Sequence, residues 1–303
     1  MAGAVFKRFI DIGFIRGAKS GNWNMNGWNM LLRPILVLEE NNAYADGKGK
    51  EYYLHYLTSE STEYHDAIPD MLKTYDPVTG LWPESPGYSF GTIQMLLEWA
   101  ILLKRSGVDI IADNPILQKA ALAVFPWMDD AANMVVFGDS RGGSANFLTF
   151  ENLLTYYSQT ANQKGVESVA GALNKGFLLG KYNRLHTDWT GICTYVAAIP
   201  SVGMENNERA SYSPHHRFIT MKNWEAPYKM MATLYGGTNG YHLTPNGLSL
   251  QFYGYGYALA PDAAAYESYW SKDHVYHQSP TGANTILPGY SEGEIVIEAM
   301  EPT

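Results

Sequence analysis

The sequence predicts an α+β protein in which a run of helices is followed by an antiparallel β-sheet. Two observations carry this prediction. Apolar residues recur at helical spacing through the first two thirds of the chain, and after about residue 205 the segments become short, β-branched or aromatic, and broken by Gly and Pro. We therefore expect a helical domain at 1–204 and a β domain at 205–303.

The helical part contains seven segments with one apolar face, separated by Pro or Gly. Pro115 follows Asn114 as a first helical residue follows an N-cap, and the turn-rich stretch 75–88 separates two helices. Helical hairpins in series are typical of an α/α toroid or solenoid, although no sequence repeat is visible. The predicted helices are 5–15, 28–39, 62–75, 91–106, 115–128, 150–162 and 166–179.

The strand-like segments are 215–237, 248–261 and 292–300. The last of them lies at the end of the given chain, which is compatible with an incomplete β domain.

Composition narrows the class of ligand. The net charge of −9 disfavours a nucleic-acid surface, because phosphate binding needs a basic face. The chain has 22 Tyr and 8 Trp, and such amphipathic rings often line sugar-binding grooves. The single Cys193 excludes an internal disulfide and a Cys-rich metal site.

No apolar run reaches the roughly 18 residues of a membrane span. Residues 1–17 are too charged for the apolar core of a signal peptide. We therefore expect either a cytoplasmic protein or an exported one whose signal has been removed.

The stretch "GDSRG" (138–142) fits the G-x-S-x-G pattern of serine hydrolases, with Ser140 as nucleophile. That fold also needs alternating strands and helices upstream, whereas this sequence predicts helix after helix. A Gly-rich loop with local contacts of Asp139 and Arg141 is the alternative interpretation.

Three stretches combine into a more specific pattern. "GNWN" (21–24) contains Asn22, "WPESPGY" (82–88) ends on Tyr88, and His242 lies near the start of "GYHLTPNGLSLQFYGYGYALAPDAAAY" (240–266). Together they resemble the heparinase II/III-like polysaccharide lyases over nearly the whole chain, most strongly from Trp224 to Pro288. The resemblance implies an α/α toroid followed by an antiparallel β-sandwich.

The resemblance also implies β-elimination in a uronic-acid polysaccharide. A proton leaves C5 of the sugar and the glycosidic oxygen departs from C4. Asn22 would neutralise the sugar carboxylate, Tyr88 would act as base and acid, and His242 would be a second acid/base or orienting group. Each has an ordinary alternative: a helix cap or Asx-turn for Asn22, loop packing for Tyr88, and a turn cap for His242.

The substrate contacts expected around these three residues are of three kinds. Indoles would stack on sugar rings, a carboxylate would bind hydroxyls, and cationic or imidazole groups would face the uronate or help to form the Tyr88 phenolate, since a free phenol has a pKa of about 10. The residues are Trp23, Trp28, Trp82, Glu84, Arg141, His216 and Arg217.

A zinc site of the family is predicted to be lost. Its β-domain signature falls on His242, Thr244, Asn246, Leu248, Ser249, Asp262 and "ANT" (283–285). The zinc-ligand positions read Thr244, Asp262 and Ala283, and one carboxylate cannot hold zinc, which takes three or four ligands. We therefore predict no metal and no other cofactor, with His274 or His277 as the substitute ligands to consider.

The expected partner is an anionic or partly neutral polysaccharide or oligosaccharide, with no nucleic acid and no membrane span. The expected location is periplasmic or secreted. The resemblance leaves the oligomeric state and the sugar open. A non-catalytic carbohydrate-binding protein on the same fold is the principal alternative, because loss of a structural metal can accompany loss of activity.

Overall fold

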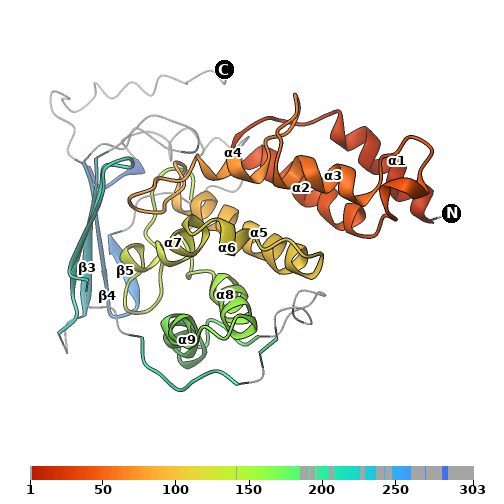
Figure 1. The fold of residues 1–303 in the computed structure, drawn as a ribbon. Coiled ribbons are helices and arrows are strands. Elements are labelled where there is room, and N and C mark those ends of the chain that lie inside the picture. Colours follow the sequence, from red (N-terminus) through yellow and green to blue (C-terminus); the bar gives the residue numbers. More distant parts are fainter. Residues whose placement is uncertain are drawn as a thin grey trace, which may run out of the picture.

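A computed structural model of the chain describes residues 2–140, 142–184, 191, 195–196, 198–204, 208–225, 229–236, 242, 248–260, 270 and 282–285. Helices occupy the first part and one five-stranded antiparallel sheet follows, which confirms the predicted α+β class. The sheet lies at one side of the molecule, and α1 to α3 lie at the opposite end (Figure 1).

The longest helix, α5, is the centre of the helical part and contacts α2, α6, α7 and α8. The helices are α1 (Ala2–Phe14), α2 (Gly21–Leu36), α3 (Lys50–Thr58), α4 (Ile68–Leu72), α5 (Pro86–Arg105), α6 (Ile110–Asp113), α7 (Ile116–Leu122), α8 (Phe147–Gln159) and α9 (Gln163–Leu178), with 3-10 turns η1 at Asn41–Ala43 and η2 at Phe125–Trp127.

The helical part differs most from the prediction in the segments around α3 and α4, and the predicted helix 115–128 is divided into α7 and η2. The predicted helix 62–75 is reduced to α4, because residues before it form a loop in which the Thr62 hydroxyl accepts the N–H of His65 and Asn24 holds the backbone of Asp66. The helix α3 was missed, because its sequence KEYYLHYLT is mostly aromatic and polar and shows little apolar periodicity. Tertiary packing of Tyr53 and Leu57 stabilises it instead.

The sheet is an up-and-down meander in which each strand pairs with the next along the chain. Its strands are β1 (Ala210–Ser213), β2 (Phe218–Asn223), β3 (Met230–Tyr235), β4 (Ser249–Gly254) and β5 (Tyr257–Ala260). Alternate residues of β2 and β4 are buried, so one face of the sheet packs against the rest of the protein.

An aromatic cluster joins that face to the helical part. The Phe137 ring lies 4.6 Å from the Tyr235 ring and 4.8 Å from the Phe218 ring, and Trp127 lies 5.3 Å from Phe218. Lys222 of β2 adds a polar link, since its Nζ donates to the carbonyls of Phe125 and Met128 at 2.6 and 2.9 Å. Burial lowers the pKa of Lys222 to about 8.

The helices and strands described here do not establish a closed toroid or a β-sandwich. The helices α1 and α2 pack together, as do α8 and α9, and the sheet is single among the described residues. The predicted boundary at 204/205 falls between α9 and β1 and stays a prediction, as do the toroid and the sandwich. The strand-like segment 292–300 lies outside the described residues.

Candidate active site

The first turn of α5 is held by the loop that follows Phe137. The Ser85 hydroxyl donates to Asp139 Oδ1 at 2.9 Å, and the Gly87 N–H donates to Ser140 Oγ at 2.6 Å. The first N–H groups of a helix have no partner within the helix, and here a neighbouring loop supplies one of them with an acceptor. This docking fixes the position of Tyr88 relative to Asp139.

A third segment, from the connection between β3 and β4, brings His242 to the same place. Its ring stacks on that of Tyr88 with centroids 3.7 Å apart and planes 14° apart. Its Nδ1 pairs with Asp139 Oδ2, and the Asp139 N–H donates to the His242 carbonyl at 3.2 Å. The helical part and the sheet part thus meet at Tyr88, Asp139 and His242.

The charges around His242 favour its protonated form. Burial lowers the pKa of His242, but the hydrogen bond and charge of Asp139, with the charge of Glu84, outweigh burial and raise that pKa above its ordinary value. Burial raises the pKa of Glu84, and the charge of His242 opposes this rise. Glu84 Oε2 and Trp82 Nε1 are both buried, and neither atom forms a hydrogen bond with another described residue.

His216 supports this site by holding the loop that carries Glu84. It is fully buried, its Nε2 donates to the Glu84 carbonyl at 3.1 Å, and its Nδ1 accepts from the Ser213 hydroxyl at 2.9 Å. Burial lowers its pKa to about 4, so the ring is neutral at neutral pH. A neutral buried ring with both nitrogens bonded holds the Glu84 loop, and this replaces the substrate contact expected from the sequence.

The fold resembles that of a heparan sulfate lyase. The chain aligns with the crystal structure of a heparan sulfate lyase HepC mutant from Pedobacter heparinus with a TM-score of 0.55 and 13% identity. The alignment covers 90% of this chain and 38% of that one, so the chain spans well under half of the lyase's length. The sequence matches no protein-family model and no curated protein. At this identity the likeness concerns the fold alone.

The indoles and cations predicted to bind substrate lie in different settings. Trp28 and Trp82 are 0% and 1% exposed and pack in the core, so they have no face open to a sugar. Trp23 is 70% exposed and Arg217 is exposed. Glu84 is buried beside His242 and not open to solvent. Arg141 lies outside the described residues.

Asn22 lies inside the first turn of α2 and not in a loop before it. Within the part of the chain that the structure describes, no hydrogen bond joins Asn22 to Tyr88, Asp139 or His242. The contact between α2 and α5 is marked by the Trp99 indole, which donates to Asn29 Oδ1 at 3.0 Å. Trp99 is about 16 Å along the α5 axis from Tyr88, at about 1.5 Å per residue. The role of Asn22 stays a prediction.

Asn24 has a structural role that separates it from Asn22. Its fully buried amide donates to the Asp66 carbonyl at 3.1 Å and accepts from the Asp66 N–H at 3.0 Å. We expect Asn24→Ala to lower the free energy of unfolding by about 2–3 kcal/mol, because a buried backbone N–H loses its acceptor. Urea unfolding measures this, with Asn22→Ala as the matched control. Equal stability of the two variants would contradict the assignment.

From the sequence, only local loop contacts were predicted for Asp139, and its pairing with His242 was missed. Asp139 lies in the "GDSRG" stretch, which was considered for Ser140 instead. Ser140 is 3% exposed and accepts from Gly87, and α8 begins only at Phe147, so the strand–turn–helix setting of a nucleophile elbow does not occur here. The available sequence signal was an acidic residue in a Gly-rich loop, but the pairing of Asp139 with His242 depends on the tertiary fold.

Gly138 is the residue that lets the loop approach His242 closely. Its φ is +66°, and a Cβ at this position would lie 2.2 Å from the His242 carbonyl oxygen. We expect Gly138→Ala to destabilise the protein by at least about 1–2 kcal/mol, because a left-handed conformation and this contact are both unfavourable for Ala. The matched control is Gly142→Ala, whose Cβ would meet only Val136 Cγ2 at 3.6 Å. Urea denaturation compares the two, and an unaffected Gly138→Ala protein would refute this role.

No group of three or more His, Cys, Asp or Glu suited to a metal occurs within the described ranges. Of the family's zinc positions, Thr244 and Asp262 lie outside those ranges, as do Asn246, His274 and His277, whereas Ala283 lies inside them. The absence of a cofactor stays a prediction. None of the helices described is long and apolar enough to cross a membrane.

Proposed function

We propose that the chain is a polysaccharide lyase that cleaves a uronic-acid-containing polysaccharide by β-elimination. The observation that supports this most is the meeting of Tyr88, His242 and Asp139, from three separate segments, in a fold similar to that of a heparan sulfate lyase. A phenol stacked on an imidazole that is paired with a buried carboxylate has the groups that proton transfer at a sugar requires.

Tyr88 is proposed as the catalytic base. The Asp139 carboxylate keeps His242 protonated, and the positive imidazolium lying 3.7 Å from the phenol ring stabilises the phenolate. The phenolate takes the C5 proton, the C5 electrons form the C4–C5 double bond, and the bond from C4 to the glycosidic oxygen breaks. The Tyr88 hydroxyl then returns its proton to the departing oxygen. Asp139 acts as a positioning residue through His242.

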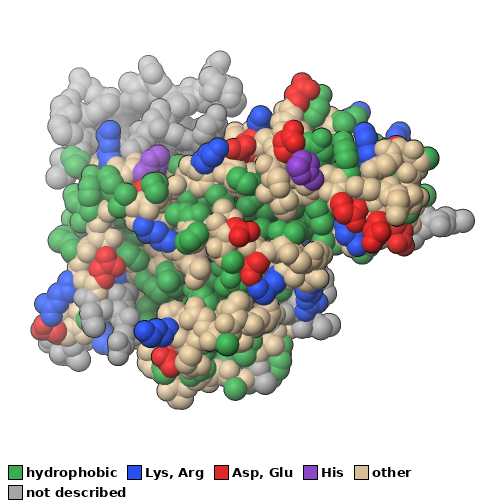
Figure 2. Space-filling view, viewed as in Figure 1, with side chains coloured by type: hydrophobic (Ala, Val, Ile, Leu, Met, Phe, Trp, Pro, Cys, Tyr) green, Lys and Arg blue, Asp and Glu red, His purple; other side chains and the backbone are tan. Residues whose placement is uncertain are grey.

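The negative charge that develops on the uronate carboxylate must be stabilised by hydrogen-bond donors. We assign this role to Asn22, with Arg141 and Arg217 as cationic neighbours and the exposed Trp23 as a stacking surface. On the face shown in Figure 2, acidic and basic side chains are interspersed with apolar ones and form no broad basic patch. A lightly charged or partly neutral polysaccharide suits such a surface and the net charge of −9.

We place the reaction in the periplasm or outside the cell, where a polysaccharide substrate is accessible, and assign it no metal. The test is incubation with heparosan, heparan sulfate, alginate and polygalacturonate, each followed by the ultraviolet absorbance of the unsaturated product. We expect at least one to give a steady rise. Binding of an oligosaccharide with no turnover over a long incubation would support a non-catalytic carbohydrate-binding protein instead.

A further inference from the structure

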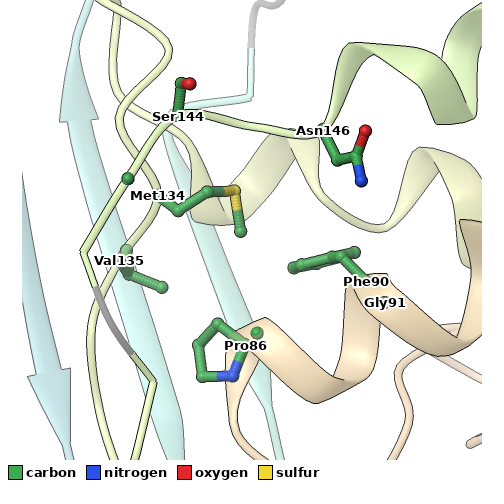
Figure 3. A pocket seen from close by; sticks show the side chains of 9 residues that line it. Pro86, Phe90, Gly91, Met134, Val135, Ser144 and Asn146 are labelled. Carbon is green, nitrogen blue, oxygen red and sulfur yellow. The ribbon is translucent and has the colours of Figure 1, made fainter. Parts of the chain in front are cut away.

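A small cavity opens beside the first turn of α5. It has a volume of about 180 Å³ and lies between that turn and the segments on either side of the 138–142 loop. In Figure 3 the Pro86 and Phe90 rings, the Met134 side chain and Val135 surround an open space, with Ser144 and Asn146 at its edge. Its lining residues are Pro86, Gly87, Phe90, Gly91, Met134, Val135, Gly143, Ser144 and Asn146.

The described lining of the cavity carries no charged side chain. None of the described residues that line it is Lys, Arg, Asp, Glu or His. The Asn146 amide is engaged, because its Nδ2 donates to Gln94 and its Oδ1 accepts the Leu148 N–H at 3.2 Å. A sulfate or carboxylate entering here would lose its hydration without gaining a cation from this described lining, which is unfavourable.

The size of the cavity excludes a whole sugar chain but admits a small group. Ligand pockets for drug-sized molecules measure about 300–1,000 Å³, whereas an apolar cavity of about 150 Å³ holds benzene. A group with one or two carbons beyond its attachment point is small enough for this space, in which Met134 and Phe90 offer apolar surface.

The cavity wall adjoins the proposed catalytic centre along α5. Gly87 lines the cavity, donates its N–H to Ser140 Oγ at 2.6 Å, and precedes Tyr88 directly. Consecutive Cα atoms lie about 3.8 Å apart, which is less than the length of a sugar ring, so a substituent in the cavity would belong to the sugar from which Tyr88 removes the C5 proton or to its neighbour. We propose that the cavity is a specificity subsite for an uncharged acetyl group on the polysaccharide. This inference rests on the proposed lyase function and names the substituent that its substrate carries.

Gly91 offers a direct way to fill the subsite. It lies within α5 on the cavity wall, and a Cβ added there would meet no heavy atom within 4 Å. A Gly91→Leu side chain would occupy the space where the acetyl group binds, and Gly91→Ala would occupy part of it. Both substitutions favour the helix, since Gly is the weaker helix former. The matched control is Gly3→Leu in α1, where an added Cβ also meets nothing within 4 Å.

The experiment compares kcat/KM for acetylated, deacetylated and sulfated forms of heparosan and alginate. A methyl-sized group in an apolar pocket changes specificity by about tenfold or more. We expect the wild-type and Gly3→Leu proteins to prefer the acetylated form of the cleaved backbone by at least about tenfold. Gly91→Leu should reduce that preference to about one, with Gly91→Ala in between.

Two outcomes separate this inference from the lyase assignment. The subsite proposal fails if cleavage is indifferent to acetylation or favours the sulfated form. It also fails if Gly91→Leu keeps the acetyl preference. Each of these results leaves the lyase function standing. If no form is cleaved, the lyase function fails, and the Met134 methyl resonance still tests the subsite. Acetylated heparosan or alginate oligosaccharides should shift that resonance and deacetylated ones should not; no shift with either acetylated oligosaccharide overturns the inference.

Discussion

Replacing Tyr88 by Phe is expected to lower kcat for β-elimination by at least about 10³-fold. The substitution removes the hydroxyl that both accepts the C5 proton and returns a proton to the leaving oxygen, and each such transfer contributes about 10²- to 10⁴-fold. The Phe ring keeps the stacking partner of His242, so the fold and substrate binding should persist. Single-turnover rates and binding of an oligosaccharide, measured on the same protein, separate these effects.

Tyr212→Phe is the matched control for this prediction. Tyr212 lies on β1 with 57% of its surface exposed, so loss of its hydroxyl should change neither rate nor binding. A Tyr88→Phe protein that retains full activity would remove Tyr88 from the mechanism. A protein that loses binding and activity together would assign Tyr88 to substrate recognition instead.

Replacing Asp139 by Asn is the second large expected effect. The variant keeps the shape of the side chain but removes the charge that holds His242 protonated and oriented, and we expect kcat/KM to fall by about 10²- to 10⁴-fold. With Asp139 gone, burial lowers the pKa of His242, so the alkaline limb of the pH–rate profile should move to lower pH. The full profile, measured on both proteins, shows the shift.

The same substitution changes stability in a pH-dependent way. The folded-state pKa of His242 is raised above its unfolded value of about 6.5, so its contribution to stability is fully present below that pH and is lost as pH rises through the folded-state pKa. The stability deficit of Asp139→Asn should therefore be larger at about pH 6 than at about pH 9, by urea unfolding.

A matched control for Asp139 is Asp130→Asn, which removes a partly exposed carboxylate paired with Lys175 and Lys229. Such a pair contributes about 0–1 kcal/mol and touches neither Tyr88 nor His242. An Asp139→Asn protein with an unshifted pH profile would show that Asp139 has only a structural role.

Much of the fold follows from local patterns. The apolar spacing that predicts helices at 91–106, 150–162 and 166–179 corresponds to α5, α8 and α9, because each buries one side against the others. The strand segments at 215–237 and 248–261 contain β2 to β5. The start of α2 was misplaced because Asn is a common cap residue, and only the fold shows that Asn24 pairs with the backbone of Asp66.

The candidate site was predictable in part. Tyr88 and His242 were selected from their own stretches, and the stacking of their rings across 154 positions of sequence depends on the docking of the β3–β4 connection against α5. Asp139 and the burial of Trp28, Trp82 and His216 depend on tertiary contacts that no local pattern encodes. The sequence marks a residue's chemistry, whereas its exposure is decided by what packs on it.

The most direct test of the lyase assignment is the structure of the product, determined by mass spectrometry and NMR after digestion of a cleaved polyuronate. β-Elimination predicts fragments with a C4–C5 double bond at the new non-reducing end, each lighter by one water than the corresponding hydrolysis product. Fragments that have gained a water and carry a saturated uronate at that end would contradict the mechanism assigned to Tyr88, His242 and Asp139.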